Sequence, residues 1–128
     1  MTFKTKLRME EYGSREWKLL TPLVYDDTFL GETFVVPPDF ITDLASIPRI
    51  FHFLLPVNDK HRAAAVLHDW LYENADNDRY TRAAIDYVFY RAMLDSGVAK
   101  WKAEIIYAAV RLFGGTTKRE TENEQDRP

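Results

Sequence analysis

The chain has 128 residues, a formal net charge of −3 at pH 7, and hydrophobic residues at 46% of its positions, so it can bury a packed core. The sequence contains no cysteine, which excludes disulfides and thiolate metal sites. A slightly acidic chain without a basic run gives no reason to expect a nucleic-acid partner.

The first forty residues have the pattern of β-strands. TFKTKLRM (residues 2–9) and EWKLLTPLVY (16–25) flank EEYGS (10–14), a hairpin-like break with a permissive glycine. A second turn at Gly31 precedes TFVV (33–36), a β-branched and aromatic run that two prolines close. These segments predict a small antiparallel sheet.

An apolar connector, DFITDLASIPRIFHFLLP (39–56), follows the strands. Asp43, Ser46 and Pro48 interrupt it, so its pattern is irregular. Because loops are usually polar and exposed, we expect a loop this rich in apolar residues to pack against the body of the protein.

Three helices are expected next, at about residues 60–73, 81–95 and 99–113, with Asn58 or Asp59 as the cap of the first. Each carries apolar residues at helical spacing, which predicts the face that it turns to the core. These predicted core residues are Ala64, Leu67 and Leu71 on the first helix, Ile85, Phe89, Ala92 and Met93 on the second, and Trp101, Ile105, Ala109 and Leu112 on the third.

The predicted architecture is α+β, with a small N-terminal antiparallel sheet followed by three helices. The first two helices are expected to be antiparallel neighbours because a short turn joins them. We expect residues 1–115 to form one domain. TTKRETENEQDRP (116–128) has no large apolar residue and is expected to be a disordered tail.

Asp86 is a carboxylate on the apolar stripe of the second helix, between Ile85 and Phe89. An unpaired buried carboxylate is strongly unfavourable, so Asp86 needs a hydrogen-bond donor. The first helix offers His68 and Tyr72 on its own inward stripe. With Asp86 accepting from one imidazole nitrogen, and from the Tyr72 hydroxyl as a second donor, the other nitrogen of His68 would face outward as an oriented general base.

Asp69 points about a quarter turn away from His68 and so serves a different partner. Asp43, in the connector, is a second carboxylate that could approach it. Two carboxylates without a thiolate suit a hard cation such as Ca²⁺ or Mg²⁺, with backbone carbonyls completing the shell. Asp69 and Asp43 are therefore candidate metal ligands.

The same residues also fit a structural interpretation. A histidine on an apolar helix face is more often a satisfied core residue than a catalyst, and a network of Asp86, His68 and Tyr72 can hold two helices together. His52, in the connector, and His61, expected at the surface beside two basic residues, are weaker candidates for catalysis.

Four segments resemble a family of uncharacterised proteins common in bacteriophages and prophages. Its signature is a Thr-Asp-Leu-Ala-Ser-x-Pro segment followed by a His-Asp-Trp-Leu-Tyr helix, and the similarity covers about residues 15–115. The resemblance implies a viral origin without assigning a function. Asp39 stands where the family pattern has glycine, and aspartate tolerates the same turn conformation. The matching segments are VPPDFITDLASIPR, AAAVLHDWLY, AAIDYVFYRAML and IYAAVRLFGG.

A second, local resemblance is to the active-site helices of the phospholipase A-two superfamily. It rests on His-Asp-x-x-Tyr on one helix and an aspartate on the next, with an upstream aspartate and paired alanines that would be Asp59, Ala63 and Ala64. The resemblance implies an antiparallel helix pair in which His68 activates water against an ester carbonyl.

In the same carry-over, Asp69 would hold calcium, and Asp86 and Tyr72 would orient the imidazole. The sequence departs from that superfamily in two ways: it has no glycine between Gly31 and Gly97 to form a glycine-rich calcium loop, and it lacks disulfides. The connector around Asp43 would have to replace that loop.

These observations favour a phage-type, metal-assisted hydrolase that acts on an ester in a lipid or cell-envelope component, with Ca²⁺ or another divalent cation as cofactor. The alternative is a non-enzymatic virion-assembly, tail or host-interaction protein that binds phage structural proteins. A phosphohydrolase of the histidine–aspartate type would need a further histidine ligand. With no apolar signal core and no membrane-spanning stretch, we expect synthesis in the host cytoplasm, with virion association left open.

Overall fold

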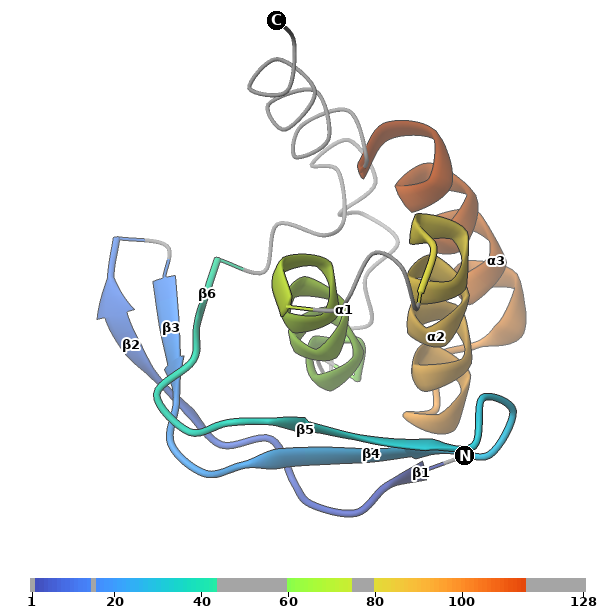
Figure 1. Ribbon diagram of the computed structural model, residues 1–128. Coiled ribbons are helices and arrows are strands. Elements are labelled where there is room, and N and C mark those ends of the chain that lie inside the picture. Colours follow the sequence, from blue (N-terminus) through green and yellow to red (C-terminus); the bar gives the residue numbers. More distant parts are fainter. Residues whose placement is uncertain (1, 15, 44–59, 75–79, 115–128) are drawn as a thin grey trace, which may run out of the picture.

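The computed structural model describes residues 2–14, 16–43, 60–74 and 80–114, which form six short strands followed by three helices and a final helical turn (Figure 1). The predicted α+β class is confirmed. The strands make two separate antiparallel sheets instead of the single sheet expected. The predicted tail (116–128) lies outside the described residues.

The first sheet has the strand order β1-β4-β5 and lies beneath the first two helices (Figure 1). Leu23 and Tyr25 of β4 are buried, and they pair with Val36 and Phe34 of β5. Alternate residues of a strand point to one face, so these four side chains form the floor of the core. The strands are β1 (Thr2–Phe3), β4 (Leu23–Asp27) and β5 (Glu32–Val36).

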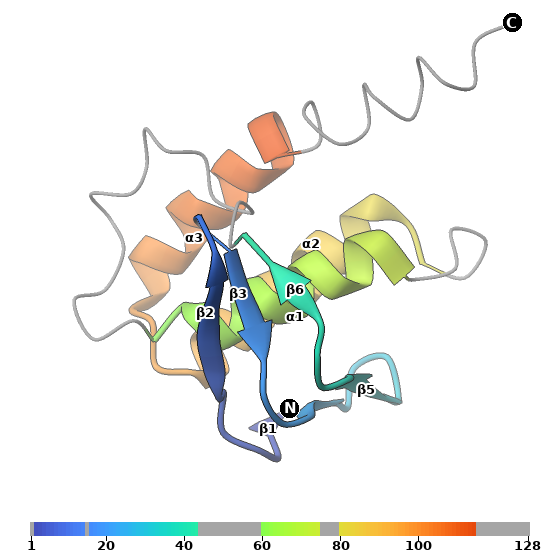
Figure 2. The same ribbon diagram turned by 90° about the vertical axis from the view of Figure 1, so that its left-hand side faces the viewer.

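The second sheet, of order β2-β3-β6, lies on the opposite side of the first helix from the second helix (Figures 1 and 2). Its strands are β2 (Met9–Gly13), β3 (Glu16–Leu19) and β6 (Ile41–Thr42). Its last strand brings the start of the apolar connector against the first helix.

The predicted hairpin is confirmed, since β2 and β3 pair antiparallel as far as Gly13 and Glu16, but residues 10–13 belong to β2 and not to the break. Met9 pairs with Leu19 and Glu11 with Trp17, so the ladder continues through these residues to a bulge just before Gly13. The predicted strand at 16–25 is divided into β3 and β4 at Leu20–Pro22, where proline cannot donate to a ladder.

Two turns contain residues with positive φ angles, as their sequences predict. Gly31, between β4 and β5, has φ 68°, and Asp39, after the two prolines, has φ 71°. The conformation of Asp39 is one that aspartate tolerates and most residues do not, which confirms that it occupies a position suited to glycine.

The three helices are α1 (Arg62–Asn74), α2 (Arg82–Asp95) and α3 (Lys100–Ala109), and α3 continues into η2 (Val110–Gly114), a π-helical turn. Thr81 caps α2 by accepting a hydrogen bond from the Ala84 N–H at 3.1 Å. The expected caps of the first helix, Asn58 and Asp59, lie outside the described residues.

The predicted core faces of α1 and α2 are confirmed, because every apolar residue predicted on these two faces is buried. The predicted core face of the third helix is wrong at three of its four residues: Trp101, Ile105 and Leu112 are 56%, 40% and 69% exposed, whereas Ala109 is buried as predicted. The other buried residues of α3 and the start of η2 are Ala103, Ile106 and Val110. α3 has apolar residues on two faces, and the face with two alanines permits a close approach to α2.

A buried ion pair ties the β4–β5 turn to α2. Arg91 of α2 donates to Asp27 at the end of β4, and both side chains are buried. The other oxygen of Asp27 accepts from the N–H groups of Phe29 and Leu30 in the turn. The position of α2 over the sheet is thus fixed by the negative charge at the end of β4. Among the described residues, no helix is long and apolar enough to cross a membrane.

Tyr25 makes a second bond between the sheet and α2, since its hydroxyl donates to Asp95 Oδ2 at 2.7 Å. Burial, the hydrogen bond to Asp95 and the nearby negative charge raise the pKa of Tyr25 above its ordinary value of 10.0. The folded protein therefore keeps this phenol neutral at a pH that ionises it in the unfolded chain.

Replacing Tyr25 with phenylalanine should lower the free energy of unfolding by about 1 kcal/mol at about pH 8, because one hydrogen bond is lost and Asp95 loses its donor. A raised folded-state pKa stabilises fully below the unfolded value and less as the pH rises above it. The difference between Tyr25→Phe and wild type should therefore shrink at about pH 11, measured by urea unfolding.

Tyr12→Phe is the matched control, since Tyr12 is 56% exposed on β2. It should leave the free energy of unfolding unchanged at both pH values. Equal stability of Tyr25→Phe and wild type at about pH 8 would contradict the contribution assigned to this bond.

Candidate active site

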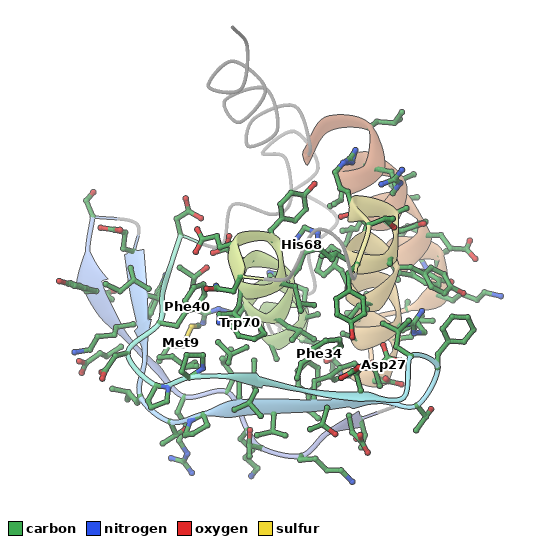
Figure 3. The ribbon with its side chains drawn as sticks, in the orientation of Figure 1. Met9, Asp27, Phe34, Phe40, His68 and Trp70 are labelled. Atoms are coloured by element: carbon green, nitrogen blue, oxygen red, sulfur yellow. The ribbon has the colours of Figure 1, made fainter. Side chains whose placement is uncertain are left out.

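His68 lies on the side of α1 that faces α2 (Figure 3). The apolar spacing of α1 turns this face inward, where Ala64, Leu67 and Leu71 are also buried. His68 itself is 3% exposed. An imidazole this deeply buried requires polar partners from the neighbouring helix.

The structure brings His68 and Asp86 together. The imidazole Nε2 lies 2.7 Å from Asp86 Oδ1, and the Asp86 side chain is fully buried on α2. A carboxylate can only accept, so Nε2 carries the proton in this bond. One turn of α1 and one turn of α2 thus meet through a short hydrogen bond to a charged group.

Two arginines that the sequence analysis did not single out complete the surroundings of Asp86. Arg111 Nη1 of η2 donates to Asp86 Oδ2 at 2.8 Å, and Arg82 Nη1 lies 3.4 Å from the same oxygen. Arg82 also donates from Nη2 to the main-chain carbonyl of Arg111 at 2.7 Å. The carboxylate is therefore shared between one imidazole and two guanidinium groups.

Only the contact of Arg82 with Asp86 could have been predicted from the sequence. Arg82 stands four residues before Asp86 on the same helix, a spacing that places an opposite charge beside it. Arg111 is 25 residues from Asp86 in the chain, and only the packing of α3 against α2 brings it to the carboxylate.

Aromatic rings contact the imidazole and restrict its orientation. The ring centroid of Tyr72 lies 5.0 Å from that of His68 at an interplanar angle of 58°, and the Phe89 ring lies at 4.9 Å and 43°. The contact described here is between the Tyr72 ring and His68, and the hydrogen bond from the Tyr72 hydroxyl to Asp86 stays a prediction. Tyr72 is thus placed to orient the imidazole by packing.

Asp69 serves a different partner from His68, as its position on the helix indicates. Its Oδ2 accepts a hydrogen bond from the Thr42 hydroxyl at 2.7 Å, and Asp69 is buried. Asp43 follows Thr42 directly and is exposed. The end of β6 therefore brings the chain at Asp43 close to Asp69.

The described side chains do not by themselves make a calcium site. Nowhere within residues 2–14, 16–43, 60–74 and 80–114 do three or more His, Cys, Asp or Glu side chains gather as metal ligands would. Calcium takes six to eight oxygens, so Asp69 and Asp43 would need other ligands, such as backbone carbonyls, to hold it. The two aspartates remain predicted ligands.

The other histidines can be placed only in part. His61, expected at the surface, is 8% exposed just before α1, so that expectation is wrong. The basic residues on either side of it do not decide which way it points. His52 and Asp59 lie outside the described residues.

The arrangement around His68 has the parts of an oriented base. A buried carboxylate fixes the ring through Nε2, two guanidinium groups balance the charge of that carboxylate, and two aromatic rings hold the ring plane. With the proton on Nε2, the lone pair of the neutral ring is on Nδ1. Such a ring can accept a proton at one defined atom.

One curated protein is similar to part of this chain. The uncharacterised protein y4iH of Sinorhizobium fredii is 40% identical over 75 residues, which is 57% of this chain and 30% of that relative. The chain therefore spans under a third of the length of this curated relative. No solved structure matches the chain.

A family model matches residues 17–110, from β3 to the start of η2, and its description is "Protein of unknown function (DUF1353)". This range contains His68, Asp69, Tyr72 and Asp86, and it ends just before Arg111. Since the match spans most of the sequence, the chain belongs to the DUF1353 family.

Proposed function

We propose that this protein is a hydrolase in which His68 is the general base and Asp86 orients it. The observation that carries the proposal is the 2.7 Å bond between His68 Nε2 and a fully buried carboxylate. A carboxylate without exposure to water is unfavourable unless it is bonded, and here the bond goes to the one side chain whose chemistry suits proton transfer near neutral pH.

The proposed reaction requires that a water molecule reach Nδ1 of His68 within hydrogen-bond distance. Nδ1 takes a proton from this water as its oxygen attacks the carbonyl carbon of an ester. The resulting imidazolium is stabilised by Asp86, which accepts from Nε2 throughout. The carbon–oxygen bond of the ester then breaks, and the imidazolium returns its proton to the leaving alkoxide.

The substrate class is part of the same proposal. The resemblance of the α1–α2 pair to phospholipase helices favours an ester in a lipid or another cell-envelope component. The resemblance to phage proteins favours a bacteriophage or prophage origin, with action on the host envelope or within the virion. These resemblances support the substrate class, whereas the proposed reaction rests on the site residues themselves.

A second candidate function follows from the burial of the same residues. His68 is 3% exposed and Asp86 is fully buried, which suits a network that holds α1, α2 and η2 together. In that case the protein is an assembly or host-interaction protein that binds phage structural proteins, and the network acts only through folding.

The His68→Gln variant distinguishes the two candidates. With vesicles of phosphatidylglycerol and phosphatidylethanolamine, and with nitrophenyl esters, wild type should release acid, and His68→Gln should lower kcat by about 10²–10⁴-fold. Glutamine can still donate to Asp86 from its amide, so the melting temperature should change little.

His61→Gln is the matched control, because His61 is also buried and lies directly before α1. It should keep the kcat of wild type. Absence of hydrolysis by wild type, together with a lowered melting temperature of His68→Gln, would contradict the hydrolase and support the structural candidate.

Calcium binding by Asp69 and Asp43 is a separate proposal that can fail without the hydrolase failing. A site with a Kd of about 0.1 mM would add about 2.7 kcal/mol to the free energy of unfolding at about 10 mM CaCl2. The melting temperature of wild type should rise accordingly, and Asp69→Asn should abolish the rise. Asparagine keeps an oxygen that accepts from Thr42, so the variant should still fold.

Asp26→Asn, a change of the same kind at a half-buried position on β4, should retain the full calcium response. A melting temperature of wild type that is the same with CaCl2, with MgCl2 and with a chelator would rule out the site.

A further inference from the structure

The two oxygens of Asp86 have different partners. Oδ1 lies 2.7 Å from His68 Nε2, while Oδ2 is 2.8 Å from Arg111 Nη1. A carboxylate can rotate about its last bond, and a contact on one oxygen therefore fixes the direction of the other. The direction of the bond to His68 depends on what holds Oδ2.

Arg111 is the stronger of the two partners at Oδ2. Arg82 Nη1 lies at 3.4 Å, near the limit of a hydrogen bond, and Arg82 Nη2 makes its shorter contact with the main-chain carbonyl of Arg111. Arg82 thus holds η2 in place more directly than it holds Asp86. The charge-assisted bond to Oδ2 comes from Arg111.

The position of Arg111 depends on a π-helical turn at the end of α3. η2 supplies both the Arg111 guanidinium that bonds Asp86 and the Arg111 carbonyl that bonds Arg82. Single π-helical turns are uncommon and often occur at functional sites. Unlike the side chain of Asp86, the side chain of Arg111 is partly exposed. Burial therefore does not fix the position of the Arg111 side chain.

We propose that Arg111 is a positioning residue for the His68–Asp86 pair. By holding Oδ2, its guanidinium keeps Oδ1 aimed at Nε2 and keeps the proton of the neutral imidazole on that nitrogen. The role in catalysis rests on the proposed hydrolase, whereas the effect of Arg111 on the imidazole is a property of the folded protein and can be measured without a substrate.

The experiment uses the full chain with ¹⁵N-labelled histidine, and reads the tautomer of His68 and the exchange of its Nε2 proton with water by NMR. The three histidine signals are assigned with His68→Gln and His61→Gln. Wild type should show the Nε2–H tautomer. Arg111→Gln should show both tautomers and Nε2 proton exchange at least about tenfold faster, the factor for losing one charge-assisted hydrogen bond.

Two further variants keep the test decisive. Arg111→Lys should retain the Nε2–H tautomer, because an ammonium group can still donate to Oδ2. Arg8→Gln, at an exposed position before β2, is the matched control and should leave the His68 signals unchanged. Should Arg111→Gln not fold, Arg111→Lys decides: mixed tautomers in that folded variant would overturn the proposal.

A purely structural role for Arg111 predicts a different result. Arg111→Gln would then melt at a lower temperature but show the tautomer and exchange rate of wild type, which would also overturn the proposal. Loss of the Nε2–H tautomer in Arg111→Gln, combined with no hydrolysis by wild type, would support the positioning role and contradict the proposed hydrolase.

Discussion

A fully buried carboxylate is the constraint on which the helical half of this protein depends. Asp86 has no contact with water, so its charge has to be met by donors from the chain. The donors come from three places: His68 on α1, Arg82 on α2 itself, and Arg111 on η2. α1, α2 and η2 therefore each contribute one side chain that binds the same carboxylate. These shared contacts fix the positions of the three segments relative to one another.

Hydrogen bonds to carboxylates also join the β1-β4-β5 sheet to α2. The carboxylate of Asp27 binds Arg91 of α2, and the Tyr25 hydroxyl binds Asp95, four residues further along the same helix. α2 is thus bonded to the sheet on one side and to α1 and η2 on the other. A histidine held within such a frame has little freedom to reorient, which is the property that the proposed general base requires.

The parts of this arrangement that could be predicted are those with a local pattern. Asp86 on an apolar stripe signals that a buried carboxylate needs a donor, and His68 on the facing stripe supplies one. Arg111 gave no such signal, because its approach depends on how α3 packs and on a π-helical turn. The exposed stripe of Trp101 and Leu112 was mistaken for the core face, since periodicity alone cannot choose between two apolar faces.

The central claim is that Asp86 and His68 are energetically coupled, and a double-mutant cycle measures that coupling directly. The free energy of unfolding would be compared for wild type, His68→Ala, Asp86→Ala and the double variant, because an alanine at either position cannot make the bond. A buried hydrogen bond to a charged group predicts a coupling of about 1.5–3 kcal/mol. A coupling below about 0.5 kcal/mol, so that the two substitutions simply add, would contradict the account.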